Sequence, residues 1–212
     1  MMAMRQAVAV LALAVAARGA PDPGEVLAPG GLPGDWKALV AALAAKGPIE
    51  ASFTERRYFP FRHEPTVLKG VLRISPERGL SLQYTDPEPS VLIADSAGLV
   101  LRDQGGSREM ASGSREAGAI ASLLPIMRFD LPALFPRFVI RARRTDADWS
   151  FEFTPRNVDS AGSLGSITVL GAGTDVRQLE FRRSASQRVE IEVGETRAGV
   201  VFTAAELARY FR

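Results

Sequence analysis

The chain has 212 residues, of which 46% are hydrophobic and 24% charged, and its formal net charge at pH 7 is +2. It contains no cysteine and one histidine, which excludes a disulfide framework, a lipid-attachment cysteine and an ordinary zinc site. Its arginines are spread along the chain without a dense basic stripe, so we expect no nucleic-acid partner. A chain of this length can bury one hydrophobic core as a single domain.

The first nineteen residues have the features of an export signal. Arg5 lies in a short amino-terminal region, and residues 7–17 form an apolar run that is too short to span a bilayer. Ala17-Arg18-Gly19 places small residues at the two positions that signal peptidase reads. We therefore predict a signal peptide over residues 1–19, cleavage before Ala20 and a periplasmic protein.

A leader and one helix are expected next. Residues 20–34 are rich in Pro and Gly and predict a flexible leader, followed by a single domain over residues 35–212. Asp35 is a candidate N-cap, because apolar residues then recur at helical spacing. These residues are Trp36, Leu39, Val40 and Leu43. Gly47-Pro48 is expected to end this helix.

Residues 49–101 alternate between apolar and polar side chains and are interrupted by turn residues. This pattern predicts short strands at about 49–58, 67–75, 80–84, 91–93 and 99–101. Gly70 suits a bulge or a close approach of another group. Period-two alternation gives an antiparallel sheet one apolar face, and few long helices follow to cover it.

The periodicity becomes helical between residues 115 and 135, where Ile120, Leu123, Leu124 and Met127 recur and Pro125 breaks the segment. Residues 130–135 predict a second short helical turn. Two interpretations remain open for this apolar insertion: a movable lid, or a crossover helix that seals the core.

Strands are predicted again at about 138–144, 149–154, 165–170, 176–183, 188–193 and 200–202, with a short helix from Thr203. About ten antiparallel strands with few helices predict a barrel or half-barrel. The arginines at 141, 143, 144, 182 and 183 are expected on solvent-facing sides of their strands.

No catalytic constellation is evident, so we expect a binding protein rather than an enzyme. His63 is expected to be a surface residue, because no Gly-x-Ser-x-Gly elbow accompanies it. Glu190 and Glu192 share one strand face opposite Val189 and Ile191, which predicts a solvent-facing pair rather than a cleft. Gly171-Ala172-Gly173 predicts a turn, and we expect no cofactor and no metal.

Four segments in order resemble the LolA-type periplasmic carriers of outer-membrane lipoproteins. They are Ile49-Glu50-Ala51-Ser52-Phe53-Thr54-Glu55-Arg56, Gly70-Val71-Leu72-Arg73-Ile74, Leu82-Gln83-Tyr84-Thr85-Asp86-Pro87 and Ser90-Val91-Leu92-Ile93-Ala94-Asp95. The Trp-x-Phe-x-Phe-x-Pro stretch at 149–155 makes the chain most similar to the divergent LolA-like branch.

This resemblance implies an incomplete antiparallel β-barrel that helices close around an apolar cavity. It implies a carrier that takes an acylated lipoprotein or glycolipid from an inner-membrane donor to an outer-membrane acceptor, and we expect a monomer. The strand residues that would line the cavity are Phe53, Leu72, Ile74, Leu80, Leu82, Tyr84, Val91, Ile93, Leu99 and Leu101. The residues that would form the lid are Ile120, Leu123, Leu124, Met127, Leu131 and Phe135.

The chain departs from the best-known carriers at one position. Those proteins have a basic residue immediately before the proline that ends the second strand, and that residue controls the closed lid. Here Ser75 precedes Pro76. Two alternatives to the carrier remain open for the chain as a whole. It could be a periplasmic module that senses a lipid or lipoprotein, or a β-sandwich whose apolar faces pack on each other without a cavity.

Overall fold

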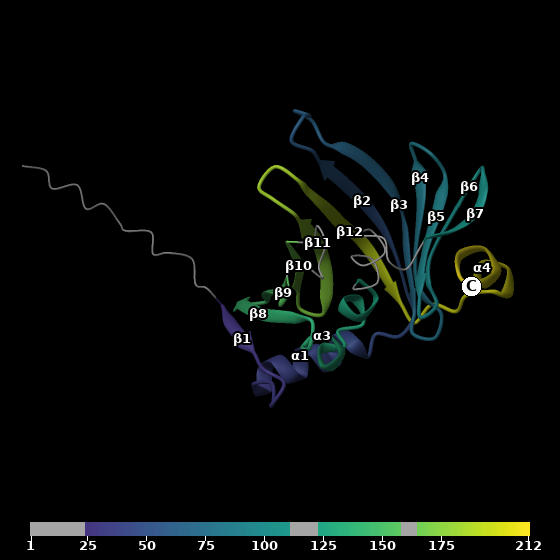
Figure 1. Ribbon diagram of the computed structural model, residues 1–212. Helices are drawn as coiled ribbons and strands as arrows, with labels where there is room; N and C mark the ends of the chain where they lie inside the picture. Colours follow the sequence, from purple (N-terminus) through teal and green to yellow (C-terminus); the bar gives the residue numbers. More distant parts are fainter. Residues whose placement is uncertain (1–23, 111–122, 158–164) are drawn as a thin grey trace, which may run out of the picture.

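The computed structural model describes residues 24–110, 123–157 and 165–212. These residues form one antiparallel sheet of twelve strands in the order β1-β8-β9-β10-β11-β12-β2-β3-β4-β5-β6-β7. Within the described part of the chain the two end strands, β1 and β7, do not pair with each other, so the curved sheet stays open (Figure 1). The predicted fold class, an incomplete antiparallel barrel with a few short helices, is confirmed.

The elements have the following bounds. The strands are β1 (Glu25–Leu27), β2 (Ile49–Tyr58), β3 (Thr66–Ser75), β4 (Gly79–Asp86), β5 (Ser90–Asp95), β6 (Gly98–Asp103), β7 (Gly106–Met110), β8 (Phe138–Thr145), β9 (Asp148–Pro155), β10 (Ser166–Ala172), β11 (Asp175–Arg182) and β12 (Arg188–Ala198). The helices are α1 (Gly34–Ala44), α3 (Leu131–Leu134) and α4 (Ala204–Tyr210), and residues 123–127 are also helical.

The strands predicted from alternation coincide with β2–β6 and β8–β12, and the C-terminal helix begins where expected. Two strands were not predicted: β1, which lies inside the segment expected to be a flexible leader, and the polar edge strand β7. The strand predicted at residues 200–202 is absent, because β12 continues to Ala198 and the chain then turns toward α4.

Helix α1 buries the side that its spacing predicts, with Trp36, Leu39 and Leu43 in contact with the core. Its start differs from the prediction. Pro33 occupies the N-cap position, and Asp35 lies in the first turn without capping it. There its carboxylate still faces the positive end of the helix dipole.

The register assigns every strand residue to one of two faces, because residues directly opposite each other in antiparallel strands share a face. We call the face that carries the main core, and that meets α1 and α3, the inner face. On β2–β6 it consists of Ile49, Ala51, Phe53, Glu55, Arg57, Leu68, Gly70, Leu72, Ile74, Leu80, Leu82, Tyr84, Leu92, Ala94, Leu99 and Leu101.

An aromatic cluster fills the inner face of β8–β10. Trp149, Phe151 and Phe153 alternate along β9, and Trp36 of α1 meets the ring of Phe151 with a centroid separation of 5.2 Å. The Trp149 indole lies over Gly171, where an added Cβ would come within 2.2 Å of the ring. This half of the sheet is therefore a packed core.

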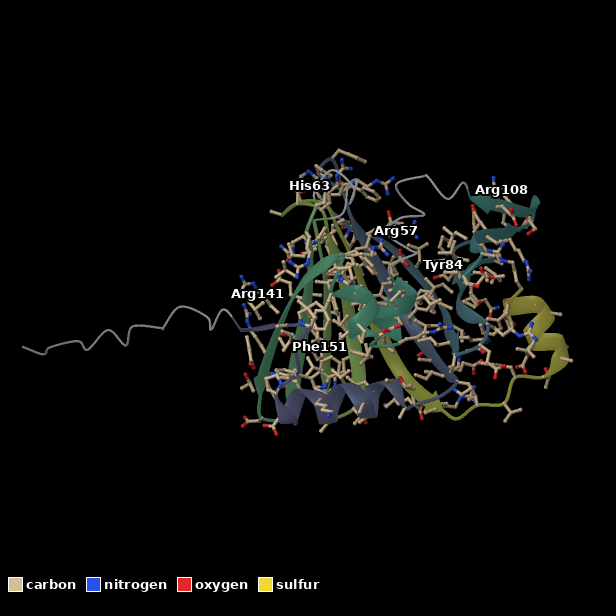
Figure 2. All side chains as sticks on the ribbon, turned by 60° about the horizontal axis from the view of Figure 1, so that its bottom comes forward. Arg57, His63, Tyr84, Arg108, Arg141 and Phe151 are labelled. Carbon is tan, nitrogen blue, oxygen red and sulfur yellow. The ribbon has the colours of Figure 1, made fainter. Side chains whose placement is uncertain are left out.

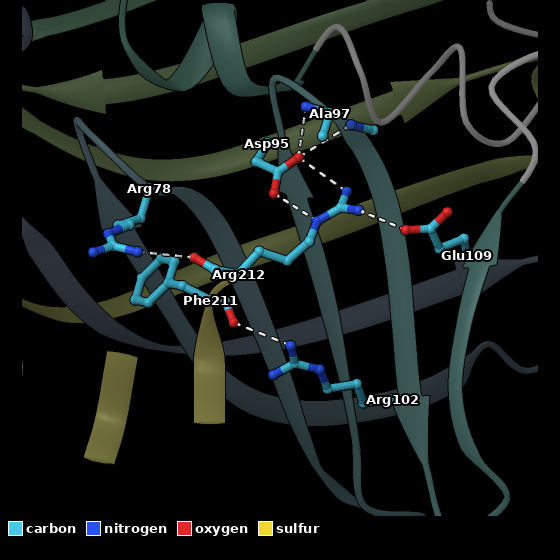
Figure 3. A network of polar contacts seen from close by, with 8 residues as sticks. Arg78, Asp95, Ala97, Arg102, Glu109, Phe211 and Arg212 are labelled. Atoms are coloured by element: carbon cyan, nitrogen blue, oxygen red, sulfur yellow. Dashed lines mark hydrogen bonds and ion pairs between the residues drawn. The ribbon is translucent and has the colours of Figure 1, made fainter. Parts of the chain in front are cut away.

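Helix α4 lies on the outer face, across the sheet from α1 and α3 (Figure 1). Phe211 is fully buried, and Arg102 donates hydrogen bonds to the carbonyl oxygens of Ala208, Arg209 and Phe211. Arg212 bonds to Asp95 at 2.7 and 2.9 Å and to Glu109 at 3.1 Å (Figure 3). The C-terminal segment thus fastens β5, β6 and β7 together from outside.

Candidate functional site

The inner face of β2–β6 is the candidate site, and most residues predicted to line a cavity lie on it. The register places eight of the ten there: Phe53, Leu72, Ile74, Leu80, Leu82, Tyr84, Leu99 and Leu101. Seven of these belong to the main core cluster, and Leu101 is half-buried. Gly70 lies between Phe53 and Tyr84, and its missing side chain leaves room for the Phe53 ring.

The prediction was wrong for Val91 and Ile93. They pair with Gln83 and Ser81, so they lie on the outer face, while Leu92 pairs with Leu82 on the inner one. Ile93 is fully buried, and on the same face the C-terminal segment bonds to Asp95 and Arg102 at neighbouring positions. Both faces of β5 are therefore apolar.

The residues predicted as a lid occupy one compact segment over the inner face. Leu123, Met127, Leu131 and Phe135 are buried in the core cluster, and Leu124 packs against it half-buried. Ile120 lies outside the described residues, as does the predicted signal peptide. Ile126, which was not predicted, is fully buried in the same segment.

The turn at Phe129 gives this segment its shape. Phe129 has φ +52°, a left-handed conformation that is unusual for a bulky residue, and it directs its ring toward Trp149 and Phe151 with centroid separations of 5.9 Å. Asp130 then caps α3 by accepting a hydrogen bond from the Ala133 amide at 3.2 Å.

Arg128 joins this segment to the β3–β4 turn. Its Nη2 donates to the carbonyl oxygen of Pro76 at 2.5 Å and to that of Ser75 at 3.4 Å. The guanidinium thus belongs to the segment over the inner face, and its two acceptors lie at the end of β3 and in the turn that follows. The contact depends on backbone oxygens of the turn, so sequence patterns gave no sign of it.

A small apolar cavity lies beneath this segment. Its volume is about 30 Å³, and its lining includes Leu43, Ile49, Leu72, Met127 and Phe129. This volume holds about one water molecule and no acyl chain. We call residues 123–135 the covering segment. A long-chain ligand requires the covering segment to move or the side chains that line the cavity to repack.

The opposite end of the inner face is polar. Glu55 is buried, and its two carboxylate oxygens accept hydrogen bonds from Arg57 Nε at 2.5 Å and from the Tyr84 hydroxyl at 2.8 Å. The Arg57 guanidinium lies 5.9 Å from the centre of the Tyr84 ring, and Figure 2 labels both residues. We call Glu55, Arg57 and Tyr84 the rim triad.

The electrostatics of the rim triad keep Tyr84 neutral and Arg57 charged. Burial, together with the neighbouring carboxylate of Glu55, raises the pKa of the Tyr84 phenol well above its usual value near 10. Burial opposes the charge on Arg57, but the Glu55 carboxylate outweighs it, so the pKa of Arg57 is raised. The triad thus combines a fixed cation, its carboxylate and a neutral hydroxyl donor.

Sequence reasoning missed the polar members of this triad. A Glu and an Arg in an alternating strand are normally taken as solvent-facing, but Glu55 and Arg57 follow Phe53 at intervals of two and share its face. That spacing was the available signal. It was masked by Arg56, which also carries charge and lies on the outer face beside Glu192.

A second depression opens at the sheet surface between β11 and β12. Their pairing runs only from Gln178–Glu192 to Arg182–Arg188, and beyond it the strands diverge at a bulge in β12. The resulting open groove has a volume of about 550 Å³ and is lined largely by polar residues. Val176, Val193 and Thr196 line both this groove and the inner cavity.

The residues weighed as catalytic candidates lie apart from the inner face. His63 is exposed in the β2–β3 loop, and Glu190 and Glu192 pair with Arg188 and Arg56 on the outer face, as predicted. The described residues contain no group of three or more His, Cys, Asp or Glu side chains placed to hold a metal ion. In the same part of the chain, no helix has the length and apolar character needed to cross a membrane.

No family model and no curated protein matches the chain. Solved structures do: the chain is similar to a LolA superfamily protein from Nitrosomonas europaea, with 8% identity, 81% of this chain and 96% of that chain covered, and a TM-score of 0.44. A putative outer membrane lipoprotein-sorting protein domain from Vibrio parahaemolyticus matches with 9% identity, 82% and 94% coverage and a TM-score of 0.45. A DUF1329 family protein from Desulfovibrio piger matches with 8% identity, 80% and 95% coverage and a TM-score of 0.48. At these identities and TM-scores the matches assign no function to this chain.

Proposed function

We propose that this protein is a periplasmic carrier that binds the acyl chains of a lipoprotein or another acylated lipid on the inner face of β2–β6. The observation that supports the proposal is an open sheet whose apolar inner face is covered by a short helical segment. In a closed barrel or a sandwich, by contrast, other β-strands would lie opposite this apolar face. The ligand would displace residues 123–135 from the inner face.

The energetics suit reversible binding. Each methylene removed from water contributes about 0.8 kcal/mol, so partial burial of one long chain supports useful affinity. Displacing the buried side chains of Leu123, Met127 and Leu131 offsets part of this gain. The sequence resemblance to LolA-type carriers and the apolar run at residues 7–17 agree with a shuttle that works between two membranes.

The decisive experiment is native mass spectrometry of the protein purified from the periplasm, followed by organic extraction. We expect a bound acylated molecule, and a mature chain that begins at Ala20. A clean apo mass, without uptake of a fluorescent fatty acyl probe afterwards, would contradict the carrier and favour a sensing module or a dry sandwich.

Two neighbouring residues of β5 provide a matched pair of variants. Leu92 is half-buried on the inner face opposite Leu82 and Leu101, and Val91 is half-buried on the outer face. Leu92→Gln is expected to weaken acyl binding at least tenfold, and Val91→Gln to leave it unchanged. Equal effects of the two substitutions would refute the assignment of the binding face.

A further inference from the structure

The inner face changes from apolar to charged along a single strand. From the α1 end toward the β2–β3 loop, β2 presents Ile49, Ala51, Phe53, Glu55 and Arg57 in turn. The apolar stretch that ends at Glu55 is roughly 20 Å long at about 3.3 Å per residue. A site of this kind is complementary to an amphiphile whose chain lies toward α1 and whose headgroup lies at the rim triad.

The two charges of the rim triad differ in what they can reach. The Glu55 side chain is 4% exposed, and both of its oxygens are engaged by Arg57 and Tyr84. The Arg57 side chain is 39% exposed and bonds to Glu55 through Nε. Among the described residues only Glu55 and Tyr84 bond to the Arg57 guanidinium, so part of its Nη1 and Nη2 edge remains open to a ligand.

This asymmetry decides the sign of the ligand's charge. A cationic headgroup would need to reach the Glu55 carboxylate, which is only 4% exposed and already accepts a hydrogen bond on each oxygen. An anionic group can meet the exposed edge of the guanidinium, whose fork fits phosphate and carboxylate oxygens in a bidentate manner. Glu55 and the Tyr84 ring hold that guanidinium in place, so little side-chain entropy remains to be lost on binding.

We propose that Arg57, oriented by Glu55 and Tyr84, binds the anionic headgroup of the acylated ligand, a phosphate or a carboxylate. The inference rests on the proposed carrier function and deepens it by naming the charge class of the ligand. It gives Glu55 and Tyr84 the role of positioning residues and Arg57 that of the contact residue.

The test compares ligands that share a chain and differ in headgroup charge. Isothermal titration calorimetry compares the affinity for palmitoyl lysophosphatidic acid with that for 1-palmitoylglycerol. It also compares palmitate with hexadecanol, with every ligand kept below the concentration at which it aggregates. We expect the protein to bind the anionic member of at least one pair about tenfold to a hundredfold more tightly, the range of a charge-assisted hydrogen bond. The pair with the larger preference identifies phosphate or carboxylate as the headgroup.

Arg56 supplies the control, because it is the adjacent arginine and lies on the outer face beside Glu192. Arg57→Gln is expected to abolish the anion preference, measured as the ratio of the affinities for the charged and the neutral member of each pair. Arg56→Gln is expected to retain the preference. Because Arg57→Gln leaves Glu55 as a buried unpaired charge, the double variant Glu55→Gln/Arg57→Gln is measured beside it, and it is expected to lose the preference as well.

The outcomes separate this inference from the proposed function. Equal binding of charged and neutral probes by the wild type would overturn the inference and leave the carrier standing. The same holds if Arg57→Gln and Glu55→Gln/Arg57→Gln both keep the anion preference. It also holds if Arg56→Gln loses as much of that preference as Arg57→Gln does. Binding of no acyl probe at all would overturn the carrier, and the inference with it.

Discussion

Tyr84 couples the rim of the inner face to the core beneath it. Its ring packs edge-on against Phe53 with a centroid separation of 5.4 Å, and its hydroxyl donates to the buried carboxylate of Glu55. A hydrogen bond to a charged acceptor contributes about 1.5–3 kcal/mol. A single hydroxyl therefore satisfies one oxygen of a buried side chain whose unpaired burial would be costly.

The raised pKa of Tyr84 predicts how stability falls in alkali. Its pKa is raised in the folded state, chiefly by burial, so above about pH 10 the unfolded chain loses this proton before the folded protein does. The stability that Tyr84 contributes is fully present below pH 10 and is lost as the pH rises further. Urea denaturation at pH 7, 9, 10 and 11 should give a steeper loss for wild type than for Tyr84→Phe, which starts from a lower free energy of unfolding at pH 7. Parallel profiles would contradict this account.

Among the elements, β5 explains why sequence reasoning located the strands and misplaced two residues of the site. Val91, Leu92, Ile93 and Ala94 are all apolar, so period-two alternation cannot say which pair faces the core. The answer depends on the C-terminal segment, which covers the outer face from more than a hundred residues away in sequence. The strands β2–β4 alternate more clearly, and the residues predicted on them to line a cavity all lie on the inner face.

Strands β1 and β7, and the charged residues Glu55 and Arg57 of the rim triad, were missed for a related reason. β1 is a short edge strand in a Pro- and Gly-rich stretch, and β7 is polar, so neither has the apolar alternation that identifies a half-buried strand. Glu55 is satisfied by Arg57 on its own strand and by Tyr84 on β4, and the contact with Tyr84 depends on how the strands pair.

The C-terminal segment predicts a loss of stability that is separate from ligand binding. Phe211 is fully buried on the outer face, so Phe211→Ala is expected to lower the free energy of unfolding by about 3–5 kcal/mol. The affinity for an acyl probe should be unchanged at temperatures well below the midpoint of unfolding. Val201→Ala is the control, since Val201 is 92% exposed and its loss should cost under about 0.5 kcal/mol in urea denaturation. A large loss of probe affinity in folded Phe211→Ala would contradict the separation of the two faces.

The contact of Arg128 with the β3–β4 turn is expected to limit how fast the covering segment opens. Arg128→Gln removes the hydrogen bonds to the Ser75 and Pro76 carbonyl oxygens, which should speed association of a fluorescent acyl probe about tenfold in stopped-flow measurements. Arg141→Gln, a change at an exposed position on β8, is expected to keep the wild-type rate. An unchanged rate in folded Arg128→Gln would show that this contact does not limit opening.

At the scale of the whole molecule, the two halves of the sheet have different tasks. On the inner face of β8–β10 the aromatic rings of β9 contact Trp36 of α1 and pack among aliphatic side chains of β8 and β10. The inner face of β2–β6 is mostly aliphatic, is covered by the segment at 123–135, and ends in the rim triad. In the proposed carrier, β8–β10 would keep their strand pairing while the segment, which also contacts Trp149 and Phe151 through Phe129, moves away from β2–β6 to admit a ligand.

This division predicts where hydrogen exchange changes when a ligand binds. The amides of Arg128, Phe129 and Asp130 donate to carbonyl oxygens within the covering segment, so its displacement should make them exchange faster in protein saturated with an acyl probe. The amides of β8–β10 should keep their protection, because these strands pair with one another and loss of the Phe129 contacts with Trp149 and Phe151 leaves that pairing intact. Mass-spectrometric hydrogen exchange with and without the probe measures both regions in one experiment. If the probe binds stoichiometrically and protection changes only along β11 and β12, the ligand occupies the groove between those strands and the covering segment has no part in binding.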